Sequence, residues 1–443
     1  MASAAEQLAA NLNFGALAKA EDLKKRLWFT LGALLVYRVG TYIPLPGIDP
    51  EALRQIFTSS QGGVLAMFNV FAGGAVGRMA IFALNIMPYI SASIIIQLLT
   101  AVVPELEKLK KEGEMGRKQL NQYTRYLTVV LAVFQSWGIS AGLQSSGQIV
   151  ANPGLFFMIT TVITLTGGTM FMMWLGEQIT QRGVGNGISL IIFAGIVAEL
   201  PSVLAQAFEL GRQGVLSTPL LLGLLILIVV TVAVIVFCER AQRRLLIQYP
   251  KRQVGNKVFE GNSSHLPLKL NTAGVIPPIF ASSLLLLPTT ALSFQANPPE
   301  WLRLMSQLLG HGQPLFLALY LLLIVFFCFF YTAIVFNPQE TADNLRKYGG
   351  FIPGIRPGEK TAAYIDYVLT RITVIGAAYI ALVCLIPELM IAQLGQSFYL
   401  LGGTSLLIVV TVTMDTVAQV QGYLLAHQYE GLVKKSQLRG KRR

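Results

Sequence analysis

Long intervals without a charged residue dominate the pattern of this chain. Six of them exceed the roughly 20 apolar residues that a helix needs to cross a hydrocarbon core of about 30 Å. These intervals are residues 79–104, 126–176, 213–238, 270–299, 304–339 and 389–414. Turn residues at 144–147 and 152–154 divide the second interval into two helices. With the weaker candidates, the pattern predicts ten spans, near residues 24–43, 77–103, 123–143, 153–175, 187–209, 216–238, 272–293, 314–336, 368–390 and 399–424.

Lysine and arginine fall mostly on one side of these spans. That side carries residues 24–26, 108–125, 182, 240–269, 346–360 and 434–443, whereas the other side has Arg54, Arg212 and Arg303. Basic loops are retained in the cytoplasm, so both termini are predicted there. Residues 1–20 lack an apolar core of their own, and we expect no cleaved signal peptide.

Composition agrees with a membrane protein. Hydrophobic residues make up 53% of the 443 residues and charged residues only 13%, about half the usual quarter for soluble domains. Too much apolar surface would be left in water for a soluble or disordered chain. The net charge of +12 therefore belongs to the loops. Cys238, Cys328 and Cys384 lie in or at the ends of apolar spans, which favours packing over a disulfide or a metal site, and we expect no cofactor.

The spans contain few groups that could carry out chemistry. Ionisable candidates are Arg38, Glu177, Arg371, Glu388 and Asp415, too few for a convincing ion or proton relay. No nucleophile and base pair, phosphate-binding loop or metal-ligand set is evident, so we expect no enzyme. Spans rich in Gly, Ser, Thr and interior Pro are compatible with ordinary packing or with a bundle built to open.

A short apolar segment, residues 64–72, lies between the pairs Gly62-Gly63 and Gly73-Gly74. It is far too short to span, so it must be re-entrant or interfacial. One interpretation is an amphipathic turn at the membrane surface. The other is a small hinged element seated in a cavity, since glycine pairs at both ends permit bending.

Two long loops on the basic side are residues 239–271 and 337–367. The first alternates basic and β-prone residues, and the second has a Gly-Pro-rich tip that presents Arg356. Their charge could serve only topology. It could equally equip protruding hairpins that dock RNA phosphate or an acidic protein surface.

Several motifs resemble the SecY family of pore-forming protein-translocation subunits. The resemblance covers about residues 20–435. Its motifs include Met87-Pro88-Tyr89-Ile90-Ser91, Trp174-Leu175-Gly176-Glu177-Gln178, Gly185-Asn186-Gly187-Ile188-Ser189, Phe336-Asn337-Pro338, Glu340-Thr341-Ala342-Asp343-Asn344 and Gly402-Gly403-Thr404-Ser405-Leu406.

The resemblance implies an all-α membrane protein with ten transmembrane helices in two pseudo-symmetric halves of five, around a central pore. We expect a cytoplasmic N-terminal segment (1–23), a first half (24–212), a second half (213–426) and a basic cytoplasmic tail (427–443). A ring of aliphatic side chains would form the waist of the pore: Ile86, Ile90, Ile188, Ile192, Ile279 and Ile408. From the sequence alone, ordinary bundle core remains the alternative for these residues.

The resemblance also implies roles for other positions. Residues 62–74 would form a re-entrant plug helix, with Val64, Leu65, Met67, Phe68, Asn69, Phe71 and Gly73 as plug residues. The second, third, seventh and eighth spans would flank a lateral gate containing Ser91, Gln97, Asn271 and Leu287. Ribosome and motor docking would use Arg243, Arg244, Arg252, Lys257 and Arg356.

The implied function is a protein-conducting channel of the bacterial inner membrane, which passes secretory polypeptides across and releases membrane helices laterally. Implied partners are SecE and SecG, the SecA motor ATPase, the ribosome with its protein and RNA, signal peptides and nascent chains, YidC and SecDF, and anionic lipids. Two positions depart from the family pattern: Asn256 stands where a basic residue is often found, and Asn85 replaces a small residue before Ile86.

A secondary transporter for a small solute remains the other hypothesis, because it also predicts ten spans with broken helices. It requires coupling, for which Arg38 and Asp415 are the candidates.

Overall fold

The computed structural model describes residues 20–49, 69, 72–145, 150, 152–213, 218–249, 252–254, 257–259, 263–293, 300, 313–394 and 403–440. Every one of the ten predicted spans overlaps a helix in these ranges. The helices are α3 (Glu21–Gly40), α6 (Met87–Val102), α8 (Glu114–Ser145), α9 (Leu155–Arg182), α10 (Gly187–Arg212), α11 (Thr218–Arg240), α12 (Ile276–Ser293), α14 (Pro314–Val335), α16 (Glu359–Leu394) and α17 (Gly403–Gly440).

Length and composition alone qualify seven helices of the described chain as membrane spans. An eighth is added if α6 and α7 (Pro104–Lys111), which meet at a bend of 100°, count as one broken span. The bend has a local cause: Val103 is extended, as expected of a residue that precedes a proline. The protein is an all-α multi-pass membrane protein.

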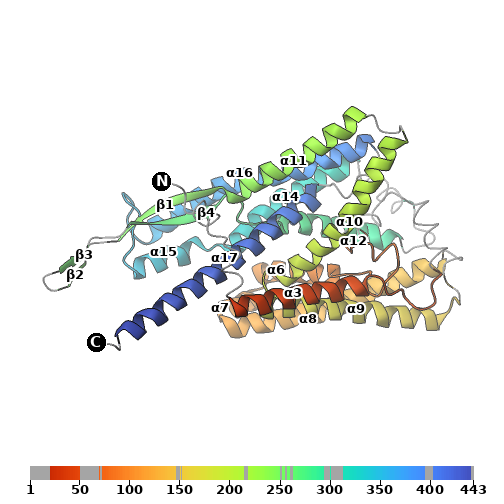
Figure 1. The fold of residues 1–443 in the computed structure, drawn as a ribbon, viewed down its shortest axis with the longest axis horizontal. Helices are drawn as coiled ribbons and strands as arrows, with labels where there is room; N and C mark the ends of the chain where they lie inside the picture. Colours follow the sequence, from red (N-terminus) through yellow and green to blue (C-terminus); the bar gives the residue numbers. More distant parts are fainter. Residues whose placement is uncertain are drawn as a thin grey trace.

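The helices form two groups. Figure 1 shows α3, α8 and α9, from red to yellow, on one side and α11, α14 and α16, from green to blue, on the other, with α10 running between them. We call α3, α6, α8, α9 and α10 the first bundle, and α11, α12, α14, α16 and α17 the second. Within the first, α8 packs against both α6 and α9; within the second, α14 packs against α12 and α16. Between them, α6 meets α12, and α10 meets both α11 and α17.

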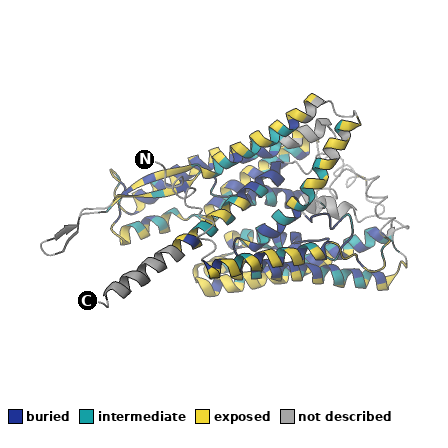
Figure 2. Ribbon diagram, in the orientation of Figure 1, coloured by how far each residue is buried: buried dark blue, intermediate teal, exposed yellow. Residues whose placement is uncertain are grey.

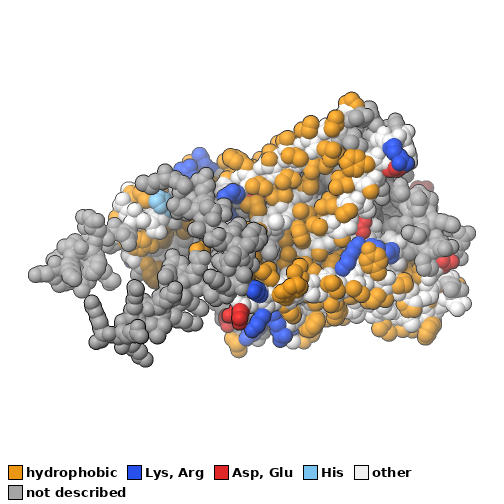
Figure 3. All heavy atoms as spheres, in the orientation of Figure 1, with side chains coloured by type: hydrophobic (Ala, Val, Ile, Leu, Met, Phe, Trp, Pro, Cys, Tyr) orange, Lys and Arg blue, Asp and Glu red, His pale blue; other side chains and the backbone are white. Residues whose placement is uncertain are grey.

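Apolar side chains cover the outside as well as the inside of the bundles. Figure 2 shows buried residues along the inner faces of the helices, and Figure 3 shows hydrophobic side chains in a broad band over α11 and its neighbours. On α11, Ile226 is 63% exposed and Val229 is 68% exposed. Such a surface is stable only in contact with lipid or another protein.

Four short strands project from one end of the bundles, which we call the hairpin end (Figure 1). Strands β1 (Gln242–Gln248) and β4 (Ser263–Lys269) pair antiparallel, and beyond them β2 (Arg252–Val254) pairs with β3 (Lys257–Phe259). The second long loop contains a helix, α15 (Pro338–Lys347), whose N-cap Asn337 accepts from the backbone N–H of Gln339 at 3.1 Å.

The structure corrects the predicted second span, residues 77–103, because the helix begins only at Met87. Residues 72–79 and 81–86 form turns, in which Met79 and Asn85 have positive φ values of 40° and 48°. Ala75, Ala80 and Ile86 are nonetheless fully buried. An apolar composition indicates that a segment is buried, but it does not show that the segment is helical. Here the surrounding protein buries a backbone that forms turns.

Other helices extend past the predicted spans. Helix α8 begins at Glu114 rather than near residue 123, α16 begins at Glu359 rather than near 368, and α17 continues to Gly440. Charged residues mark the end of the apolar span, but they do not end the helix. The helix continues into solvent, where its turns tolerate charged side chains.

A candidate pore constriction

The six isoleucines assigned to the ring belong to, or pack against, one large apolar cluster that both bundles share. Ile86 precedes α6 and Ile90 lies on it, Ile188 and Ile192 share one face of α10, and Ile279 and Ile408 come from α12 and α17. Ile86, Ile90, Ile192 and Ile408 are at most 6% exposed, and Ile188 and Ile279 are half-buried against them. Four of them, Ile86, Ile90, Ile192 and Ile279, also line one small cavity, and the assignment of all six to a pore ring stays a prediction.

One small cavity lies among four of these isoleucines. A cavity of about 10 Å³ lies among Asn85, Ile86, Met87, Ile90, Ile192, Ile279 and Ser282. That volume is at the lower limit for one water molecule. Aliphatic side chains also offer no ligand to an ion, so a constriction made of them disfavours both water and ions.

Asn85 positions the first isoleucine of the ring. Its φ of 48° lies in the left-handed region, which asparagine adopts more readily than most residues. The chain turns there, and the N–H of Ile90 then donates to the carbonyl of Ile86 at 3.1 Å. The left-handed backbone gives a physical reason for asparagine at position 85, where the family pattern has a small residue.

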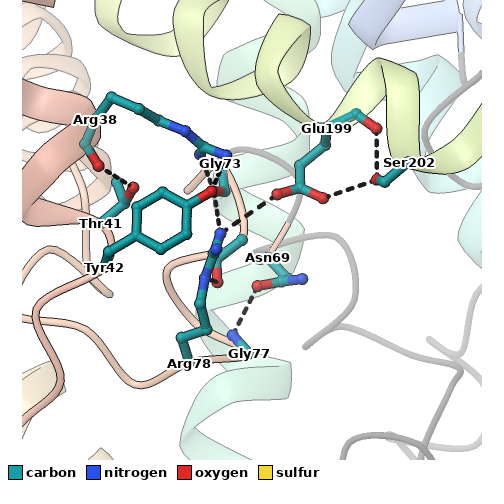
Figure 4. Close-up of polar contacts among 10 residues, drawn as sticks. Arg38, Thr41, Tyr42, Asn69, Gly73, Gly77, Arg78, Glu199 and Ser202 are labelled. Carbon is teal, nitrogen blue, oxygen red and sulfur yellow. Dashed lines mark hydrogen bonds and ion pairs between the residues drawn. The ribbon is translucent and has the colours of Figure 1, made fainter. Parts of the chain in front are cut away.

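Only two of the assigned plug residues, Asn69 and Gly73, are among the described residues. Asn69 Oδ1 accepts from the N–H of Gly77 at 2.7 Å, and its carbonyl accepts from the N–H of Gly74 at 2.8 Å (Figure 4). Val64, Leu65, Met67, Phe68 and Phe71 lie outside the described residues.

Two of the assigned gate residues lie on α6, one lies on α12 and one lies just before α12. Ser91 is buried on α6, and Gln97, one turn and a half further, donates to Ser93 Oγ at 3.3 Å. Asn271, just before α12, donates to Glu239 and to the carbonyl of Gly274 instead. Leu287 lies on α12. Their gating role stays a prediction.

Three of the assigned docking residues belong to one folded platform at the hairpin end, and the other two lie beyond it on a separate pair of strands. Gln248 and Phe351 exchange backbone hydrogen bonds of 2.9 and 3.0 Å, which join the two long loops. Leu245 and Leu268 from the strands pack with Ile352 and with Ile365 of α16. Arg243, Arg244 and Arg356 are exposed on this platform, and Arg252 and Lys257 lie on β2 and β3. Asn256 lies outside the described residues.

Ionisable groups within the spans pair at separate places. Arg125 makes a bidentate contact with Glu177, with N–O distances of 3.0 and 2.6 Å. Lys269 Nζ lies 4.0 Å from Asp415, and Arg371 stacks on the Tyr367 ring. Arg38 donates to the carbonyl of Gly73. The side chain of Glu388 is not among those described. These pairs connect helices or turns, which is a structural role.

The sequence reasoning missed Arg78 and Glu199, which form an ion pair of 3.5 Å beside the described end of the plug segment. The sequence did contain a signal for this ion pair, because Arg78 falls inside the predicted span 77–103 and Glu199 falls inside the predicted span 187–209. Opposite charges within two spans suggest a pair.

Comparison with known proteins gives a consistent result. The family model for SecY matches residues 80–417. The protein translocase subunits SecY of Rickettsia typhi and Escherichia coli K12 are each 55% identical, over 94% and 95% of this chain and 97% and 96% of their own lengths.

Solved channels share the fold. A SecY structure concerned with its plug domain and the closed channel aligns with a TM-score of 0.63 at 18% identity, covering 90% of this chain and 92% of that one. Canine Sec61 in a ribosome-channel complex aligns with a TM-score of 0.61 at 17% identity, with the same coverage of 90% and 92%.

Proposed function

The chain belongs to the SecY family, and from that premise we propose that it is the central subunit of a protein-conducting channel in the bacterial inner membrane. It passes unfolded secretory polypeptides across the membrane and releases membrane helices sideways into the lipid. The family consists of channels, so no covalent step is involved.

One observation carries this proposal: Ile86, Ile90 and Ile192 of the first bundle and Ile279 of the second line a cavity of only about 10 Å³. With Ile188 and Ile408, which belong to or pack against the same apolar cluster, they form the proposed ring. Such a ring seals against ions because it dewets when narrow. Rotamer changes let it yield to a passing side chain of any chemistry, since it makes no directional bond. The energy for transport comes from partners.

Lateral release follows from the contact between α6 and α12. These helices come from different bundles and are in contact, which supports a separation of the bundles toward lipid at this place. A segment of about 20 apolar residues is more stable in hydrocarbon than in a wet pore, so partitioning needs no motor. Ser91, Gln97, Asn271 and Leu287 are the proposed gate residues, and residues 62–74 the proposed plug.

The hairpin end is the proposed cytoplasmic face, because the basic loops and the ends of α3 and α17 lie there. Its platform suits the ribosome and the SecA motor, with Arg243, Arg244, Arg252, Lys257 and Arg356 as contacts. The canine Sec61 relative stands in a ribosome-channel complex. SecE, SecG, YidC, SecDF and anionic lipids are the remaining proposed partners.

Crosslinking of an arrested secretory chain tests the proposal. Single cysteines replace Ile86, Ile279 or Ile408 on a background in which Cys238, Cys328 and Cys384 are changed to alanine. We expect adducts with the chain at all three positions. Val229→Cys is the matched control, because this α11 residue is apolar but faces outward, and it should give none.

The absence of ring adducts in a complex that still exports protein would refute the proposed path. The transporter hypothesis makes a different prediction: solute uptake that disappears in Asp415→Asn or Arg38→Gln variants. In the structure Arg38 is bound to Gly73 and Asp415 lies beside Lys269, which favours structural roles for both.

A further inference from the structure

Two arginines converge on one backbone carbonyl at the end of the proposed plug. Arg38, in the last turn of α3, donates from Nη1 to the carbonyl of Gly73 at 2.7 Å. Arg78 donates from Nη2 to the same oxygen at 3.0 Å and from Nε to the carbonyl of Gly74 at 3.0 Å. Figure 4 shows the side chains closing on this point. Hydrogen bonds from charged donors are about twice as strong as neutral ones.

Neighbouring groups hold the two cations in place. Arg78 forms an ion pair of 3.5 Å with Glu199 of α10, and Glu199 Oε2 accepts from Ser202 at 3.2 Å. Both guanidinium groups also lie over the Tyr42 ring, at 4.8 Å for Arg38 and 4.1 Å for Arg78. The carboxylate and the electron-rich ring offset the repulsion between the cations.

The backbone at this point favours glycine. Gly73 and Gly74 have φ values of 62° and 80°, which other residues adopt only with strain. A side chain on Gly73 would come within 3.0 Å of the Gly195 backbone, and one on Gly74 would collide with Arg78 and Glu199. The close approach places the two carbonyls within reach of the arginines.

We propose that Arg38, Arg78 and Glu199 are positioning residues that anchor the Gly73 carbonyl to the first bundle and keep the proposed plug seated in the resting channel. This inference rests on the proposed function, because residues 62–74 are a plug only if the chain is a channel. All three side chains come from α3, α10 and the turns before α6. Separation of α6 from α12 therefore leaves the anchor intact, and Gly73-Gly74 is the fixed end of the plug.

Ion conductance of the resting complex in planar bilayers tests the anchor, with Arg78→Gln as the main variant. This variant removes two charged hydrogen bonds and an ion pair, and the conductance should rise about tenfold. That value is at the low end of what such bonds contribute, because the pair between Arg78 and Glu199 is partly solvated. Arg78→Lys keeps the charge but loses the forked geometry, so its leak should be intermediate. Glu199→Gln should also leak, by less than Arg78→Gln.

Two matched controls separate the anchor from general loss of stability. Arg212→Gln breaks an exposed pair on the same helix, where Arg212 lies 3.3 Å from Glu209, and should leave the conductance unchanged. Arg125→Gln breaks the bidentate pair with Glu177 and should lower the thermal unfolding temperature without a leak. Equal leaks from Arg125→Gln and Arg78→Gln would overturn the proposal.

Deletion of residues 64–72 distinguishes failure of the anchor from failure of the plug assignment. If the deletion leaks while Arg78→Gln is as tight as the parent, the anchor is wrong and the plug remains. If the deletion itself stays tight, the plug assignment fails and the proposed role of the anchor fails with it. Leaks from both, with tight controls, are the result we expect.

Discussion

Single residues set the geometry of the constriction. Asn85 turns the backbone through the left-handed region, and Ile86 and Ile90 then face the other bundle. The ring could not be identified from periodicity, because isoleucines that face a pore and isoleucines in a bundle core give the same pattern. It came from the family resemblance. The structure places the six residues in or against one large apolar cluster, which a bundle core would also form, so the ring stays a prediction.

The backbone at Asn85 makes a prediction at this scale. Asn85→Gly should keep the turn, whereas Asn85→Val should destabilise it by about 1–2 kcal/mol, because a β-branched residue is strained at positive φ. Thermal unfolding of the purified complex should therefore fall for Val and change little for Gly. If both variants unfold at the same temperature, the left-handed turn is not what selects this residue.

Secondary-structure elements show where local sequence signals succeed and where they fail. Alternating basic and β-prone residues predicted the hairpins, and β1 to β4 lie within that loop. The helix α15 was missed although Asn337-Pro338 is a helix-start signal, because the stretch was treated as one loop. The contact between Gln248 and Phe351 joins residues about 100 positions apart, and no local pattern specifies such a pairing.

The platform predicts a selective defect for Arg356→Glu. Reversing an exposed charge at a docking surface creates like-charge repulsion with an acidic partner, so motor-driven export should fall roughly tenfold or more. Insertion of membrane helices should fall less. Both are measured in the same inverted vesicles, with Arg212→Glu, an exposed arginine at the far end of α10, as the control. Equal loss of export and insertion would indicate misfolding.

The whole molecule depends on how two bundles meet. Charge-free intervals predicted the approximate position of most long helices, because hydrocarbon imposes a length and a composition on a span. They did not predict that residues 72–86 are buried turns or that α6 contacts α12. Both depend on contacts between distant segments, and apolar residues look alike whether they face lipid, a bundle core or a closed pore.

Locking the two bundles together tests their separation. Ile90→Cys and Ser282→Cys place one thiol on α6 and one on α12, at residues that line the same small cavity. With the native cysteines removed, oxidation should abolish insertion and signal-dependent export by at least tenfold, and a reductant should restore both. Each single cysteine variant should remain active. Full activity of the oxidised pair would show that the bundles need not part at this contact.

The central claim is that polypeptides cross between the six isoleucines, and the most direct test is a structure of the complex arrested with a secretory chain. We predict density for the extended chain surrounded by Ile86, Ile90, Ile188, Ile192, Ile279 and Ile408, with the ring widened around it. An arrested chain that instead lies outside the ring, while the isoleucines remain packed as they are here, would contradict the account.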